Sequence, residues 1–197
     1  MKNICVFCSS SDAISQKYFD VAKGLGEIMA KNNFDLVYGG AGVGLMKKVS
    51  DAVKNNGQKV TGVIPEAIQN KRIGNEYLDT LFITKTMHER KQKMYELSDA
   101  FIALPGGFGT LEELLEIMTL KQLEYHKKPI VIFNQDGFFD NILKQFDVFY
   151  DEKFSKSVYQ KIYHLSDNLE DTFYYIKNYK YEVIDSKWFD VSEKAFE

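Results

Sequence analysis

The 197-residue sequence has only two cysteines and three histidines. Cys5 and Cys8 form a C-x-x-C pattern, but no second cysteine pair accompanies it, which argues against a zinc site or a redox motif. The two residues lie three positions apart on one predicted strand, so their side chains should point to opposite faces of a sheet. We therefore expect both thiols to pack in the core, and the sequence predicts no metal site.

Long apolar runs and a strong charge of either sign are also missing. No stretch approaches the roughly 20 apolar residues that span a bilayer, and the N-terminus lacks a signal-peptide pattern. The 25 Lys and Arg residues nearly balance the 28 Asp and Glu residues, which gives no general attraction for nucleic acid. We expect a cytoplasmic protein without nucleic-acid or membrane partners. A hydrophobic content of 45% suits one compact domain over residues 1–197.

Short apolar runs alternate with longer amphipathic stretches along the chain. The pattern predicts strands at residues 4–8, 36–38, 59–64, 81–84, 100–104, 130–133 and 162–165. It predicts helices at residues 15–33, 45–56, 87–98, 110–125, 138–150 and 169–178. This alternation indicates an α/β fold, a Rossmann-like doubly wound parallel sheet with helices on both faces. The irregular residues 65–80 are a candidate lid or pocket wall, and residues 181–197 are a candidate appendage.

Ligands of such sheets bind beyond the carboxyl ends of the strands, so the loops there matter most. The first predicted strand runs into Ser9, Ser10, Ser11 and Asp12. Hydroxyl groups at a strand-to-helix junction can cap the helix or bind a phosphate or ribose oxygen. Taken alone, the loop favours capping.

The second predicted strand runs into a glycine-rich loop, Gly39 to Gly44. Gly40 and Gly42 fit the first two positions of a dinucleotide fingerprint, but its third position falls on Leu45, which argues against a redox NAD site. Four glycines in six residues allow a ligand to approach the backbone closely. A tight turn with close helix–sheet packing explains them equally well.

The fifth predicted strand ends in P-G-G-F-G and passes into a helix that Thr110 should open. Apolar residues at helical spacing predict its core face, namely Leu111, Leu114, Leu115 and Met118. Thr110 and Glu113 have the spacing of a capping box. However, a glycine loop before a helix N-terminus also makes an anion site, and Glu113 lies off the predicted core face. Its carboxylate would repel a phosphate, so it suits a neighbouring electron-deficient centre.

The helix predicted at residues 87–98 begins with the cations His88, Arg90 and Lys91. Cations are unfavourable at the positive end of a helix, and a local rule broken without evident gain indicates a functional site. An exposed charged face is the simple explanation. An anionic ligand, or Glu113 from the neighbouring loop, would provide compensation.

With these residues identified, the sequence resembles the LONELY GUY (LOG) family of cytokinin-activating phosphoribohydrolases, formerly labelled lysine decarboxylases. The family motif P-G-G-x-G-T-x-x-E is matched in full from Pro105 to Glu113, and M-H-x-R-K is matched from Met87 to Lys91. The segment Gly-Gly-x-x-x-Gly-Leu-Met is similar from Gly39 onward. The resemblance extends over about residues 4–149.

The resemblance implies hydrolysis of the N-glycosidic bond of nucleoside 5′-monophosphates, AMP or cytokinin nucleotides, to free base and ribose 5-phosphate. It implies that Arg90 and Glu113 carry the chemistry, that no cofactor takes part, and that the protein is a homodimer with the site near the interface. Substrate contacts of the family map onto Lys91, Gly107, Phe108, Gly109, Thr110, Leu111, Glu112 and Thr119. From the loops after the predicted strands we add Gly106, Ser9 and Gly40 as substrate-binding candidates.

The sequence departs from the family in two places. Plant members commonly read T-W-A-Q-L where this chain has Thr119-Leu120-Lys121-Gln122-Leu123, and residues 66–79 match poorly. Both differences leave the preferred base open between adenine and prenylated adenine. The alternative function is a nucleotide-binding carrier or sensor without turnover. A pyridoxal-phosphate decarboxylase is disfavoured because the lysines are expected on polar helix faces.

Overall fold

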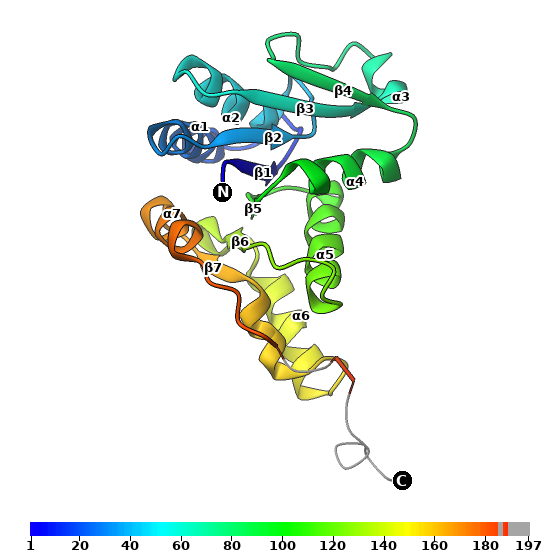
Figure 1. Cartoon of the computed structure of the whole chain (residues 1–197). Helices are drawn as coiled ribbons and strands as arrows, with labels where there is room; N and C mark the ends of the chain where they lie inside the picture. Colours follow the sequence, from blue (N-terminus) through cyan, green and yellow to red (C-terminus); the bar gives the residue numbers. More distant parts are fainter. Residues whose placement is uncertain (185–186, 189–197) are drawn as a thin grey trace.

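The computed structural model describes residues 1–184 and 187–188. Within them, seven parallel strands form one sheet in the order β4-β3-β2-β1-β5-β6-β7 (Figure 1). The strands are β1 (Asn3–Phe7), β2 (Asp35–Tyr38), β3 (Val60–Pro65), β4 (Thr80–Thr84), β5 (Ala100–Ala103), β6 (Ile130–Phe133) and β7 (His164–Ser166). The chain builds one half outward from β1 to β4 and the other from β5 to β7. This is the predicted doubly wound sheet, and its order reverses between β1 and β5.

Helices cover both faces of the sheet (Figure 1). They are α1 (Gln16–Lys31), α2 (Gly44–Asn55), α3 (Glu66–Gln69), α4 (Met87–Leu97), α5 (Phe108–Gln122), α6 (Asp140–Asp151) and α7 (Leu169–Asn178), with the 3₁₀ helices η1 (Gln135–Gly137) and η2 (Ser157–Ile162). Apolar residues of α1, α2 and α7 pack on one face, and those of α4, α5 and α6 pack on the other.

The central strands are buried on both faces, which explains their nearly continuous apolar runs. Every residue of β2, β5 and β6 is buried. Cys5 and Cys8 are buried free thiols that belong to the cores on opposite faces, as the period-two argument predicts. Their role in core packing is therefore confirmed.

Two segments differ from the sequence-based expectation. Ile162 does not begin the seventh strand but ends η2, from which its side chain packs into a core, so the apolar signal came from a 3₁₀ turn. The expected irregular segment at residues 65–80 contains α3, and its Gly74 forms an antiparallel bridge with Ala41. Backbone contact with the loop at Ala41 thus orders part of a segment that has no periodic sequence pattern.

The end of the chain is described only in part. Of the predicted appendage at residues 181–197, residues 185–186 and 189–197 lie outside the described residues. Across the part that is described, no helix combines the length and the apolar character needed to cross a membrane.

Close packing of α1 on α2 depends on Gly26. A Cβ at this position would lie 2.6 Å from the Cβ of Ala52 and 2.8 Å from the carbonyl oxygen of Val49. Gly26→Ala should therefore force the helices apart and lower the free energy of unfolding by about 1–3 kcal/mol, measured by urea denaturation. Gly24→Ala is the matched control, because its Cβ would meet only the flexible end of Leu169 at 3.2 Å. Equal stability of the two variants would contradict the packing argument.

Candidate active site

A cavity of about 640 Å³ lies at the carboxyl ends of β1, β2, β3 and β5. The loop after β1, the loop after β2 and the start of α5 line it, together with the beginning of α4 and the segment around α3. The cavity thus opens where the strand order reverses between β1 and β5, the expected ligand position in an open α/β sheet.

A buried ion pair joins α4 to α5 at this cavity. The Nη1 of Arg90 donates a hydrogen bond to Oε1 of Glu113 over 2.5 Å, and both residues are only 7% exposed. The Nε of Arg90 donates to the carbonyl oxygen of Val63 in β3, over 3.1 Å. The guanidinium is therefore held from two directions and fixes the position of the Glu113 carboxylate.

Gly39 makes room for this guanidinium. A Cβ at position 39 would lie 2.1 Å from Nη2 of Arg90, closer than any real contact. This explains one glycine of the loop after β2 by the approach of a side chain, which neither of the two sequence-based explanations included.

Burial raises the pKa of Glu113 above its ordinary value, while the charge and hydrogen bond of Arg90 oppose the rise. A carboxylate held in this balance remains able to accept a proton or to stabilise a neighbouring positive charge. The cavity also contains Cys8, but burial raises the pKa of that thiol far above neutrality. Cys8 is therefore a poor nucleophile.

The first turn of α5 presents its backbone N–H groups without a side-chain cap. Gly107 is the N-cap residue, and within residues 1–184 and 187–188 no side-chain cap bonds to this helix end. The prediction that Thr110 caps the helix is wrong, because α5 begins at Phe108, two residues earlier. Glu113 does not complete a capping box either, since Arg90 holds its carboxylate. The uncapped end adds free donors and a helix dipole to the cavity.

The same T-x-x-E spacing does cap α4. The hydroxyl oxygen of Thr86 accepts a hydrogen bond from the backbone N–H of Glu89, over 3.1 Å. The carboxylate of Glu89 in turn accepts from the backbone N–H of Lys85, over 2.9 Å. The same spacing therefore gives a capping box at Thr86 and Glu89 but not at Thr110 and Glu113. The difference is the buried Arg90, which binds the Glu113 carboxylate.

The predicted core face of α5 is partly wrong. Leu114 and Met118 are buried as expected, but Leu115 is 40% exposed, while Ile117 and Glu113 are buried. The buried face is therefore rotated toward α4, because Arg90 gives Glu113 a partner there. The cations at the start of α4 are compensated by carboxylates of α5, as one of the sequence-based explanations required.

Lys91 is the second cation of this pairing. Its ammonium forms ion pairs with Glu112 and, over 3.2 Å, with Glu116. Burial alone would lower the pKa of Lys91, but its hydrogen bonds to these two carboxylates raise it. Two consecutive residues of α4, Arg90 and Lys91, therefore both pair with carboxylates of α5.

Comparison with known proteins agrees with these motifs. A family model described as "Possible lysine decarboxylase" matches residues 46–176. The cytokinin riboside 5′-monophosphate phosphoribohydrolase LOG2 of Arabidopsis thaliana is 45% identical over 161 residues, which cover 82% of this chain and 76% of that protein. The chain belongs to the LOG family.

Another relative of this LOG-family chain matches nearly its whole length. The phosphoribohydrolase LOG7 of Arabidopsis thaliana is 39% identical over 199 residues, 99% of this chain and 92% of that protein. Among solved structures, a molybdenum cofactor binding protein from Rippkaea orientalis matches with a TM-score of 0.68 and 22% identity, covering 90% and 96% of the two chains. At that identity the likeness shows the fold alone.

The LOG-family cavity gathers most of the residues predicted for the site. Arg90 and Glu113 line it together with Ser9, Gly107, Phe108, Gly109, Thr110 and Glu112. The side chains of Ser9 and Ser11 accept backbone hydrogen bonds within their own loop, so this loop does not cap α1, whose N-cap is Ser15. The capping interpretation of the serines is therefore wrong.

Five predicted residues are not among the described residues that line this cavity: Lys91, Gly106, Leu111, Thr119 and Gly40. A Cβ on Gly106 would collide with the Thr110 side chain, and Gly40 turns the chain with a φ of +76° against β3. Thr119 lies two turns farther along α5, in a separate hollow of about 320 Å³ that also contains Leu115, Phe149 and Phe154.

The cavity has an apolar wall, of which the sequence predicted only the part in residues 65–80. The wall consists of Met46, Ile64, Pro65, Ile68, Ile73 and Met87, from four separate segments. Two isoleucines within the poorly periodic residues 65–80 were the available signal, and they support the prediction of a pocket wall there. The sequence arguments missed one carboxylate, Asp12, which lines the cavity and accepts a hydrogen bond from the backbone N–H of Gly44 over 3.0 Å.

Proposed function

We propose that this LOG-family protein hydrolyses the N-glycosidic bond of nucleoside 5′-monophosphates, either AMP or cytokinin nucleotides, to free base and ribose 5-phosphate. The buried Arg90–Glu113 pair in the cavity wall carries the proposal. The lining of the cavity combines serines and the uncapped α5 end with apolar side chains. The polar groups suit a phosphate, and the apolar side chains suit a base.

The reaction breaks the bond between C1′ of ribose and the base nitrogen. Positive charge builds on the sugar as the bond lengthens, as in glycosidases. The Glu113 carboxylate stabilises this charge and orients a water molecule, whose oxygen bonds to C1′. One proton of that water ends on the departing base, and the other stays on the new hydroxyl group.

Arg90 favours the ionised form of Glu113 and orients it, because its charge and hydrogen bond oppose the burial that favours the neutral acid. The backbone from Gly106 to Thr110 holds the 5′-phosphate at the α5 N-terminus, with help from Ser9. Lys91 pairs with Glu112 and Glu116 and so supports the same end of α5. We assign Gly40, Leu111 and Thr119 to substrate binding on the strength of the sequence alone.

We further propose a cytoplasmic homodimer whose interface lies near the site, with one domain per chain. Exposed Leu115, Phe149 and Phe154 surround the hollow at Thr119. Apolar patches of this kind mark protein–protein interfaces, and a second copy on this patch would bring Thr119 to the interface.

The glycines at the phosphate end allow a direct test of ligand approach. A Cβ on Gly107 or Gly109 would meet no protein atom within 4 Å, and neither residue has a positive φ. Neither packing nor backbone strain therefore requires glycine there. Gly109→Ala should fold normally, since alanine favours a helix, yet raise KM for AMP about tenfold or more by displacing the phosphate. Gly24→Ala is the control, and an unchanged KM in Gly109→Ala would contradict the phosphate assignment.

The decisive assay incubates purified protein with AMP and with prenylated AMP and measures free base and ribose 5-phosphate by chromatography. We expect both products in equal amounts from at least one substrate. Tight nucleotide binding in calorimetry with no product from either substrate would overturn the hydrolase proposal and favour the carrier or sensor.

A further inference from the structure

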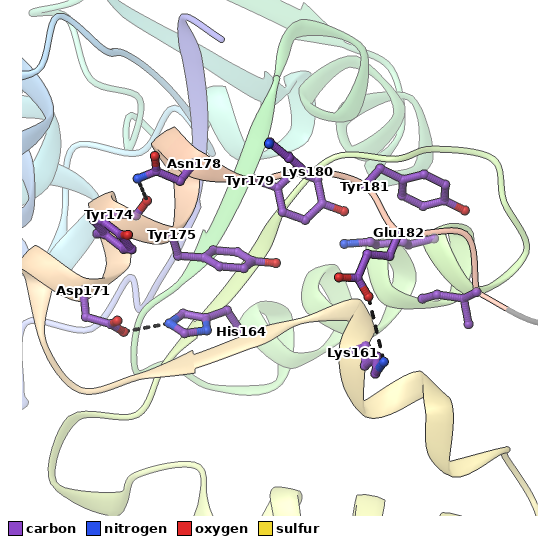
Figure 2. Close-up of a pocket in the computed structure, with 12 residues that line it drawn as sticks. Lys161, His164, Asp171, Tyr174, Tyr175, Asn178, Tyr179, Lys180, Tyr181 and Glu182 are labelled. Atoms are coloured by element: carbon purple, nitrogen blue, oxygen red, sulfur yellow. Dashed lines mark hydrogen bonds and ion pairs between the residues drawn. The ribbon is translucent and has the colours of Figure 1, made fainter.

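A second cavity, of about 610 Å³, lies between β7, α7 and the end of α5 (Figure 2). We call it the tyrosine pocket after Tyr175, Tyr179 and Tyr181, which line it together with Lys121 and His164. It shares no described lining residue with the candidate active site. We propose that the tyrosine pocket binds a small aromatic anion, a flat ring that carries a carboxylate or phosphate group.

The charge of Lys121 is the first observation behind this proposal. The residue is 3% exposed, and its Nζ has no hydrogen-bond partner among the described residues. Its nearest compensation is the ring of Tyr179, whose centroid lies 4.9 Å from Nζ. A cation–π contact replaces only part of the hydration that a buried ammonium loses. The expectation that the lysines lie on polar helix faces is wrong for this residue.

The carboxylates of the pocket are already engaged elsewhere. Asp171 forms a hydrogen bond with His164 over 2.7 Å, and Glu182 forms an ion pair with Lys161 over 3.8 Å (Figure 2). Burial lowers the pKa of Lys121 to about 8, so the group still carries a proton for most of the time at neutral pH. Among the described residues, no carboxylate pairs with Lys121, so a ligand can supply the anion that completes the pocket.

The aromatic lining indicates the remainder of that ligand. Tyr175 stacks on His164 with ring centroids 4.3 Å apart and an interplanar angle of 10°. Tyr179 meets the Tyr175 ring edge-on at 5.5 Å. Figure 2 shows both tyrosine rings pointing toward the middle of the pocket. Flat rings bind well against such surfaces by offset or edge-on stacking, which leaves an attached acid group for the ammonium.

Lys121 lies eight residues after Glu113, outside the segment from Pro105 to Glu113 that matches the family motif. The charge that defines the tyrosine pocket therefore lies outside the residues assigned to hydrolysis, although it shares α5 with Glu113.

The test uses benzoate and phenyl phosphate as aromatic anions, with benzyl alcohol as the neutral analogue, in calorimetric titrations of the full chain. Lys121→Met keeps the side-chain length and removes the unpaired charge, so the variant should fold at least as stably as the parent. We expect at least one anion to bind the parent, and the variant to bind it about tenfold or more weakly. Lys180→Met, which removes an exposed lysine of the same pocket, should bind nearly as the parent does.

A second readout distinguishes the tyrosine pocket from the active site. Reductive methylation with a ¹³C label lets NMR follow the titration of Lys121, and a bound anion should raise the pKa of this group above its value in the ligand-free protein. Hydrolysis of AMP by Lys121→Met should stay at the parental rate, so failure of one proposal leaves the other standing. Absence of binding at millimolar concentration, or equal binding by Lys121→Met and the parent, would overturn the inference.

Discussion

Glu113→Gln is expected to lower kcat/KM for AMP hydrolysis by about 10²- to 10⁴-fold. The substitution keeps the shape of the side chain and a hydrogen-bond acceptor for Arg90, but it removes the negative charge that stabilises the ribose cation. It also removes the group that can take a proton from water. Initial rates of ribose 5-phosphate release, with nucleotide affinity measured separately, would show the loss in kcat more than in KM.

Glu96→Gln is the control for this experiment, because Glu96 lies on the surface of α4 and pairs with Lys93 over 3.8 Å. Its kcat/KM should match that of the parent protein. If Glu113→Gln retained full activity, the carboxylate would have no part in the chemistry, and the buried pair would be purely structural.

Arg90→Met is expected to lower both stability and activity. The variant leaves the buried Glu113 carboxylate without its partner, and loss of one member of a buried pair costs about 3–5 kcal/mol. Without Arg90, the main opposition to burial is lost and the pKa of Glu113 rises further. A larger protonated fraction of Glu113 removes the charge needed for catalysis, so kcat should fall at least about 10²-fold.

The free energy of unfolding of Arg90→Met should depend on pH, because the pKa of Glu113 is raised in the folded state. In Arg90→Met the folded state holds the Glu113 proton more tightly than the unfolded state does. The loss of stability should therefore be small at acidic pH and grow as pH rises through the ordinary pKa of a glutamate toward the raised folded pKa. Urea denaturation at several pH values measures this slope.

A double variant separates stability from catalysis. Arg90→Met combined with Glu113→Leu replaces the ion pair by an apolar pair, which should recover much of the lost stability because no unpaired charge remains buried. Its activity should stay as low as that of either single variant. Additive losses of stability in the double variant would show that Arg90 and Glu113 do not act as a pair.

The strands were predictable because they are buried on both faces. β2, β5 and β6 appear in the sequence as short apolar runs, and each lies within one or two residues of its expected position. The motif segments were also recognisable from the sequence. Glycines cluster directly after predicted strands, and cations stand at the start of a helix, where they are unfavourable. Thr110 and Leu115 show the limit. Their predicted roles rested on the spacing of residue types along the chain. Spacing does not show that α5 begins two residues earlier than expected, or that α4 packs against one side of α5.

The sequence by itself determined the alternation of strands and helices, the glycine loops at the strand ends, and the residues Arg90 and Glu113 as candidates. These properties are local, because they follow from the order of residue types along the chain. Only the tertiary structure decided that Arg90 meets Glu113, that Gly39 makes room for it, and that Lys121 is buried without a hydrogen-bond partner among the described residues. Each of these depends on segments far apart in sequence, and the pairing of β1 with β5 brings the two halves together. Burial and charge pairing are properties of that assembly, and they turn a glutamate with capping-box spacing into the proposed catalytic residue.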